Sequence, residues 1–268
     1  MAGHSHWKSI KHKKGLADAK RGKIFSKLAK LITVAARHGG GNPADNLRLR
    51  YAIDKARAES MPKDSVERAV KKGTGELQGM ELVELTYEGI GPGGISLIVE
   101  VLTDNRNRTG GEIRNILERR GGSLGKANSV LWKFDRKGIL GISSMDVSEE
   151  EIFEAGIEAG ADNIEAVEGG FDVSTRVEDF EQVRAALEAH LQKKRAKPEK
   201  KWGETQDERP FFNRNEIVYL PQTPILLEGE RARQVFQLVN DLEDHEDVQS
   251  VFSDSDIPEE ILEGMAAE

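Results

Sequence analysis

Apolar residues recur every three or four positions through the opening third of the chain, which is the spacing of one helix face. Between residues 20 and 37 the apolar positions form one narrow arc and lysines form a second arc beside it. The apolar members are Ile24, Phe25, Leu28, Leu31, Ile32 and Ala35. This pattern predicts an amphipathic helix with one buried face and one lysine-rich face.

Two further helices are predicted before residue 75. Three glycines at 39–41 end the first helix, and Asn42-Pro43 then offers an N-cap and a first-turn proline for a helix through Arg57. Pro62 begins a third helix that ends near Gly73. The three helices predict a small all-helical domain.

Strands and helices alternate from Gly79 onward. Strands are predicted at 82–88, 95–103, 129–134, 138–142, 162–168, 171–176, 216–220 and 248–252, and helices at 106–120, 148–159, 177–191 and 230–242. Ser148 and Glu151 have the spacing of a capping box at the start of the second of these helices.

This order fits two split β-α-β units and predicts the α+β class. We expect a small N-terminal three-helix domain followed by two ferredoxin-like α+β lobes, one inserted in the other. The expected boundaries are 1–78 for the helical domain, 79–135 plus 222–254 for a discontinuous domain, and 136–221 for the inserted acidic domain. A polar stretch at 192–213 with a basic run at 193–201 is predicted to be a surface insertion.

Composition excludes several classes of protein. The 268 residues include no cysteine, which rules out a disulfide scaffold, a thiol nucleophile and any cysteine-ligated metal. The longest nearly apolar run is 95–99, far shorter than the roughly 20 residues of a membrane helix. The N-terminal residues resemble neither a secretory signal nor a transit peptide, so we expect no membrane contact and a cytoplasmic location.

The charge of the chain is divided very unevenly. The net charge is −8 overall, yet residues 1–72 contain 18 Lys and Arg against 6 Asp and Glu. Residues 141–190 contain 14 acidic and 2 basic residues. A polyanion would be repelled there, so nucleic acid should meet the N-terminal third.

The first thirty residues are the main candidate binding segment. Nine basic side chains and Trp7, a possible stacking ring, share this segment with Asp18, its one acidic residue. The candidates are Trp7, Lys8, Lys11, Lys13, Lys14, Lys20, Arg21, Lys23, Lys27 and Lys30. Lysine clusters bind phosphates without reading bases, although a merely solubilising face is the alternative.

A second basic group opens the helix predicted at 106–120. Arg106 and Arg108 belong to the segment Asn105-Arg106-Asn107-Arg108-Thr109. Two interpretations stand side by side: the segment caps the helix, or it holds a phosphate at the helix N-terminus.

Two glycine-containing segments imitate nucleotide motifs. Residues 89–94 spell G-x-G-x-x-G, but strand-like residues follow where a dinucleotide fold needs a helix, so a hairpin loop is predicted. Gly125-Lys126 resembles the end of a phosphate-binding loop but is followed by Ala127 instead of Ser or Thr. We expect no cofactor.

Metal binding and catalysis have little support in the sequence. The pair His4-x-His6 lacks a further cysteine or nearby carboxylate, and solvated or phosphate-facing imidazoles are the favoured interpretation. The carboxylates of 146–188 accompany no catalytic motif and are interpreted as a solvated acidic face. We therefore expect no metal and no enzymatic activity.

Several long motifs in the correct order resemble the YebC/PmpR family. They are the segments 1–8, 10–14 and 18–23, the stretch Tyr87-Glu88-Gly89-Ile90-Gly91-Pro92-Gly93-Gly94, and Thr103-Asp104-Asn105-Arg106-Asn107-Arg108-Thr109. The resemblance covers about 1–190 and 214–252, and the 192–213 insertion departs from the usual family length. It implies a helical domain plus two α+β domains in a non-enzymatic cytoplasmic protein, usually described as a DNA-binding transcriptional regulator.

The resemblance also implies a second function. Mitochondrial relatives activate translation, and bacterial members have been linked to ribosomes stalled on proline-rich nascent chains. DNA and ribosomal RNA both satisfy the charge argument, and lysines do not favour base readout. The predicted partner is therefore nucleic acid, DNA or ribosomal RNA, with the ribosome as a possible assembly and a purely protein-binding adaptor as a further alternative.

Overall fold

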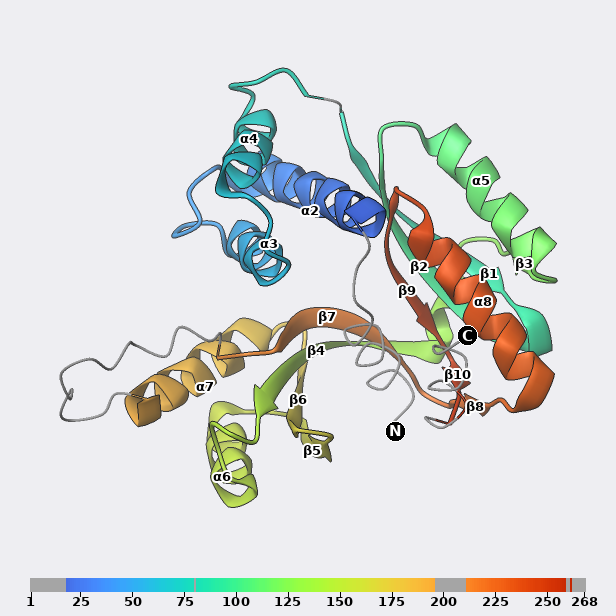
Figure 1. The fold of residues 1–268 in the computed structure, drawn as a ribbon. Coiled ribbons are helices and arrows are strands. Elements are labelled where there is room, and N and C mark those ends of the chain that lie inside the picture. The colour runs from blue at the N-terminus through green and yellow to red at the C-terminus, as the bar shows by residue number, and fades with distance from the viewer. Residues whose placement is uncertain (1–17, 80, 196–210, 259–260, 262–268) are drawn as a thin grey trace. The chain divides into compact units, whose positions relative to one another are not determined.

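The computed structural model describes residues 18–79, 81–195, 211–258 and 261 (Figure 1). Its chain divides into two compact units, one containing 135–220 and the other containing the residues on either side. The fold is α+β, with N-terminal helices followed by sheet-containing parts, as the sequence predicts. No helix among the described residues is both long and apolar enough to span a membrane.

Three helices form the N-terminal part of the first unit. They are α2 (Asp18–Gly39), α3 (Leu47–Ala58) and α4 (Lys63–Thr74), and α2 contacts both of the others. The apolar arc predicted on α2 supplies the core, where Leu28, Ile32 and Ala35 are buried against α3 and α4. The period of three and four therefore identified the buried face correctly.

One predicted helix end in this part is wrong by a few residues. Asn46 caps α3 in place of Asn42: its side chain accepts from the Leu49 N–H at 3.1 Å and donates to the carbonyls of Ala35 and Gly40 at 2.8 Å each. The Asn46 side-chain amide thus satisfies backbone groups at the end of α2 and at the start of α3. Asn42 instead accepts from the Ala44 N–H and stabilises the turn that precedes α3. The third helix ends at Thr74, near Gly73 as predicted, and Gly75 with its φ of +84° forms the C-cap.

The same unit contains a four-stranded antiparallel sheet in the order β3-β1-β2-β9. Its elements are β1 (Val83–Ile90), β2 (Ser96–Thr103), α5 (Arg106–Arg119), β3 (Ser123–Leu124), α8 (Gly229–Asp244) and β9 (Val248–Ser253). Helices α5 and α8 contact each other and pack on the sheet, so that Leu97, Ile113 and Leu238 share one core (Figure 1). A short parallel pair, β8 (Ile225–Leu226) and β10 (Ser255–Asp256), lies beside this core.

The G-x-G-x-x-G segment joins two paired strands, as predicted for a hairpin. Strands β1 and β2 pair from Val83 opposite Thr103 to Ile90 opposite Ser96, and the short helix η1 (Pro92–Gly94) lies in the loop between them. Because this hairpin comes before α5, the chain runs β-β-α-β-α-β here, which differs from the β-α-β-β-α-β order of a ferredoxin-like lobe.

The strand predicted at 129–134 is wrong. Residues Leu131–Lys133 form a 3-10 turn, η2, and extended structure begins at Phe134 with β4 (Phe134–Ser143). The physical reason is the buried Glu88 carboxylate, which takes the backbone N–H groups of Val130 and Leu131 that a strand would give to its neighbour.

The second unit follows the predicted β-α-β-β-α-β order. After β4 come α6 (Glu149–Ala159), β5 (Asn163–Val167), β6 (Gly170–Arg176), α7 (Phe180–Arg195) and β7 (Arg214–Pro221), with sheet order β5-β6-β4-β7. The capping box between Ser148 and Glu151 is confirmed. Helix α7 reaches Arg195 and β7 begins at Arg214, so the helix continues into the predicted insertion, and 196–210 lie outside the described residues.

Candidate nucleic-acid interface

The predicted binding residues fall into three groups. Trp7, Lys8, Lys11, Lys13 and Lys14 lie outside the described residues, and so does the side chain of Lys20, although its backbone belongs to α2. On α2, Arg21 and Lys23 are exposed, whereas Lys27 and Lys30 are partly covered. On α5, Arg106 and Arg108 are both exposed at the first turn.

The lysine face of α2 lies against the C-terminal end of α8. Lys23 Nζ donates to the Asp244 carbonyl at 3.4 Å, Lys30 Nζ donates to the Glu246 carbonyl at 3.2 Å, and Lys27 Nζ donates to the Glu243 carbonyl.

These lysines supply the positive charge and the hydrogen-bond donors that the C-terminal end of α8 lacks. The last carbonyls of a helix have no partner within the helix and carry the negative end of its dipole. The last turn of α8 contains no basic residue of its own. The α2 lysines therefore satisfy carbonyls and neutralise charge at this helix end.

Asp247 is the centre of this contact. Its side chain is 0% exposed, and it accepts from Lys30 Nζ at 2.5 Å, from Arg108 at 2.9 Å and from the Thr109 hydroxyl at 2.6 Å. Burial raises the pKa of the Asp247 carboxyl, but the hydrogen bonds from Lys30, Thr109 and Arg108 outweigh it and hold the pKa well below its usual range. Asp247 is thus a buried anion with two cationic partners.

The segment that opens α5 is a helix cap. The Asn105 side chain accepts from the Arg108 N–H at 3.1 Å, and Thr103 and Thr109 share a hydrogen bond of 2.8 Å between their hydroxyls. Arg108 also pairs with Asp104 at 2.9 Å, so its guanidinium bridges two carboxylates. The capping interpretation is confirmed, while a phosphate at this N-terminus stays a prediction.

The structure joins two patches that the sequence presented as separate. Lys30 of the basic N-terminal segment and Arg108 of the α5 segment bind the same carboxylate, on different oxygens. Sequence reasoning missed Asp247, because a single Asp before a strand carries no local signal of its role. Lys27, Lys30 and Arg108 therefore have a structural function, and their contact with nucleic acid stays a prediction.

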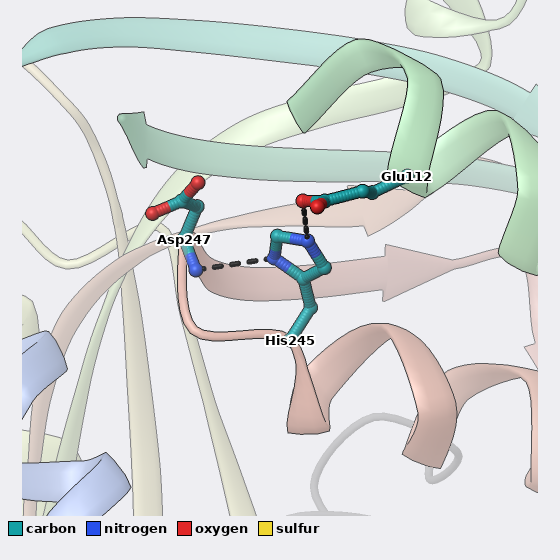
Figure 2. Close-up of side chains that lie close together, drawn as sticks. All are labelled: Glu112, His245 and Asp247. Carbon is teal, nitrogen blue, oxygen red and sulfur yellow. Dashed lines mark hydrogen bonds and ion pairs between the residues drawn. The ribbon is translucent and has the colours of Figure 1, made fainter. Parts of the chain in front are cut away.

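A histidine beside this cluster brings three potential metal ligands together (Figure 2). His245 Nδ1 accepts from the Asp247 backbone N–H at 3.1 Å, and Nε2 lies 2.8 Å from a Glu112 carboxylate oxygen. In the neutral ring the proton therefore sits on Nε2 and points to Glu112. The Asp247 carboxylate already accepts hydrogen bonds from two cations and a hydroxyl, so its oxygens are not available as metal ligands. The cluster of Glu112, His245 and Asp247 therefore does not fit a metal ion.

An open depression lies next to His245. It has a volume of about 550 Å³ and is lined by Glu112, Asn115, Ile116, Glu118, Arg119 and His245. This lining carries both signs of charge and includes the hydrogen-bonded pair of Glu112 and His245, with no serine, threonine or lysine among its residues.

Comparison with known proteins covers nearly the whole chain. The family profile described as the TACO1/YebC protein N-terminal domain matches residues 5–76, and the profile described as the TACO1/YebC second and third domain matches 82–207 and 203–255.

Similar proteins are known from several bacteria. A probable transcriptional regulatory protein from Geobacter sulfurreducens is 48% identical over 98% of this chain and 99% of its own length. Another from Syntrophobacter fumaroxidans is 46% identical over 99% of this chain and 100% of its own. The crystal structure of a conserved hypothetical protein from Aquifex aeolicus matches with a TM-score of 0.79 and 41% identity over 96% of this chain and 99% of that one.

Proposed function

Because the chain belongs to the TACO1/YebC family, we propose that it is a non-enzymatic regulator of gene expression that binds DNA through its basic N-terminal part. Relatives that match along their full length are named probable transcriptional regulatory proteins. The observation that carries the proposal is the charge division: 18 basic against 6 acidic residues in 1–72, within a chain of net charge −8. A polyanion is attracted to the first segment and repelled by the remainder.

The contacts of the α2 lysines refine which residues would hold phosphates. Lys27 and Lys30 already bind α8 and Asp247, so recruiting them would break internal hydrogen bonds. We assign phosphate binding to the predicted segment from Lys8 to Lys14, to the exposed Arg21 and Arg106, and to Lys23, which is exposed although its Nζ lies 3.4 Å from the Asp244 carbonyl. Lys27, Lys30 and Arg108 then act by keeping α2, α5 and α8 together.

Ribosomal RNA is the second candidate ligand, and one observation favours it. The exposed first turns of α2 offer Arg21 and Lys23 but no Asn or Gln beside them, so the side chains that read adenine are missing, whereas Arg and Lys bind the phosphates of any sequence. Recognition of backbone and shape suits structured RNA as well as DNA. If the partner is ribosomal RNA, the function would be to relieve ribosome stalling on proline-rich nascent chains. If the partner is a basic protein, the chain would act as an adaptor. The cytoplasmic location stays a prediction of the sequence.

Binding by the full chain tests the proposal. Fluorescence anisotropy with labelled duplex DNA and with a structured RNA should give affinities that fall steeply with salt concentration. Reversing two charges, Lys11→Glu with Lys14→Glu, should reduce the slope of log affinity against log salt by about 2 in magnitude. The matched control is Arg114→Glu with Arg231→Glu, which changes the net charge equally at exposed positions on α5 and α8.

Equal losses in both double variants would refute the assignment to the N-terminal part. Crosslinking in cells, followed by sequencing of bound DNA and RNA, then separates the two ligands. Discrete promoter peaks support transcriptional regulation, whereas enrichment of ribosomal RNA alone overturns it in favour of the ribosomal function.

A further inference from the structure

The loop between β3 and β4 displays a large aromatic side chain to solvent. Trp132 is 66% exposed, and residues 126–129 in the same loop are exposed as well. A tryptophan normally buries most of its ring, so an exposed one in an ordered loop points to a ligand or a partner.

The loop is held in place by a buried carboxylate. Glu88 is 6% exposed, and its side chain accepts from the backbone N–H groups of Asn128 at 2.5 Å, Val130 at 2.7 Å and Leu131 at 2.9 Å. Converging backbone N–H groups of this kind commonly form an anion site. Here the anion is the Glu88 carboxylate of the same chain. These three backbone N–H groups of the loop, which resembles a phosphate-binding motif in sequence, are therefore already hydrogen-bonded.

The backbone of the loop leaves little freedom for another conformation. A Cβ at Gly125 would lie 2.4 Å from the Ser129 hydroxyl, and Asn128 has a φ of +62°, which asparagine tolerates better than most residues. The Gly125 N–H also donates to the Glu88 carbonyl at 2.7 Å. The tip of the loop is therefore preorganised.

The indole of Trp132 is oriented without being covered. Its Nε1–H donates to the Ser129 carbonyl at 3.1 Å, and Lys133 Nζ lies 5.8 Å from the ring centroid. Lys133 Nζ also donates to the Ser96 hydroxyl at 2.8 Å, which anchors that cation to β2. The ring is thus fixed by its polar edge while most of the side chain stays exposed to solvent.

The other exposed side chains of the loop suit a nucleotide. Lys126 is exposed and carries a positive charge, and Asn128 and Ser129 add exposed polar groups. A protein partner would call for further apolar residues at the tip, but 126–129 are polar apart from Ala127. A loop that carries both an exposed aromatic ring and an exposed lysine can stack one base and hold a neighbouring phosphate.

We propose that Trp132 is a stacking platform for an unpaired base of single-stranded nucleic acid, with Lys126 holding an adjacent phosphate. The inference rests on the proposed nucleic-acid function and adds a second contact point, located on the sheet-containing part of the first unit. The ligand must be single-stranded here, because a base in a duplex already stacks on its neighbours.

Three variants of the full chain test this site. We would compare Trp132→Ala, Trp132→Phe and the control Met145→Ala, which truncates another apolar side chain that is 77% exposed. The probes are a labelled 12-nucleotide oligouridylate and a labelled DNA duplex, measured by anisotropy at several salt concentrations. Trp132→Ala should weaken single-strand binding by about 5- to 150-fold and leave duplex binding unchanged. Trp132→Phe should retain most of the affinity, since phenylalanine still offers a ring face.

The outcomes separate this site from the general function. If the wild-type chain binds neither probe, both proposals fail. If the wild type binds both probes and Trp132→Ala binds the single strand equally well, only the stacking site fails. The stacking site also fails if Trp132→Ala loses affinity for the single strand and for the duplex to the same extent. Ultraviolet crosslinking gives an independent readout, because a stacked uridine should crosslink at Trp132. A protein captured through Trp132 with unchanged single-strand affinity would overturn the proposal in favour of a protein interface.

Should Trp132→Ala fail to fold, Lys126→Ala and the crosslink keep the site testable. Lys126→Ala should lower the slope of log affinity against log salt for the single strand by about 0.7 in magnitude and leave the duplex slope unchanged. An unchanged single-strand slope together with no crosslink at Trp132 would overturn the proposal.

Discussion

The buried Asp247 carboxylate offers the sharpest test of how the first unit is held together. The substitution Asp247→Asn keeps the size of the side chain and one acceptor oxygen, but it removes the negative charge. Removing one member of a buried charge pair costs about 3–5 kcal/mol when the partner charge stays buried. Here Lys30 is 21% exposed and Arg108 is 40% exposed, so water screens both cations after the substitution. We therefore expect a loss of about 2–3 kcal/mol of unfolding free energy at pH 7.

The dependence on pH has a defined sign. The folded pKa of Asp247 lies below the unfolded value of about 4, so its contribution is fully present above pH 4 and is lost as pH falls through the folded pKa. The stability gap between the wild type and Asp247→Asn should therefore narrow by about 1 kcal/mol between pH 7 and pH 3.

Urea denaturation followed by circular dichroism measures both effects, and hydrogen exchange of amides in α5 and β9 assigns the loss to the first unit. Asp104→Asn is the matched control, because Asp104 binds the same Arg108 at 2.9 Å but is 31% exposed. It should cost under about 1 kcal/mol. A loss below about 0.5 kcal/mol for Asp247→Asn at pH 7, or a gap that widens in acid, would refute the reasoning.

Three further substitutions probe separate contacts. Glu88→Gln removes the charged acceptor of three backbone N–H groups and should lower the unfolding free energy by about 1–3 kcal/mol. Hydrogen exchange of the amides in the loop that carries Trp132 should become faster. Unchanged exchange would contradict the anchoring role of Glu88. Thr109→Val deletes the hydroxyl that donates to the Asp247 carboxylate and should lower the unfolding free energy, measured by urea denaturation, by about 1–2 kcal/mol. Gly73→Ala places a Cβ 2.4 Å from the backbone carbonyl of Thr33 and should cost about 1–3 kcal/mol in thermal or urea unfolding. Its control, Gly22→Ala on α2, meets nothing within 4 Å and should be neutral or stabilising by up to about 1 kcal/mol.

Hydrophobic periodicity was sufficient for the local architecture. Leu28 and Ile32 are buried on α2 as the spacing predicts, and the capping box of Ser148 begins α6 at the expected residue. Both depend on neighbours within a few positions in the sequence, where helix geometry alone decides which residues share a face.

Predictions at the ends of elements failed where distant residues compete for the backbone. Asn46 replaces Asn42 as a cap because it also reaches the end of α2, eleven and six positions earlier. The expected strand at 129–134 is lost to Glu88, about forty positions away in the chain. Such partners have no periodic signature, so no window of sequence reveals them.

The lysine face of α2 also shows that distant partners cannot be predicted from a local pattern, here for residues of functional interest. Lysines on one helix arc indicate an exposed cationic surface when the helix is considered alone, but α2 turns part of that arc toward the carbonyls at the end of α8. A helix end rich in acidic residues, with none of the basic residues that usually accompany its last turn, is the one sequence feature that could have indicated this partner. Since Lys30 and Arg108 share Asp247, the number of lysines overstates the charge available to a polyanion. On α2, the proposed phosphate contacts are therefore to be sought before Lys27, which makes the N-terminal segment, and not the whole lysine face, the first place for mutation.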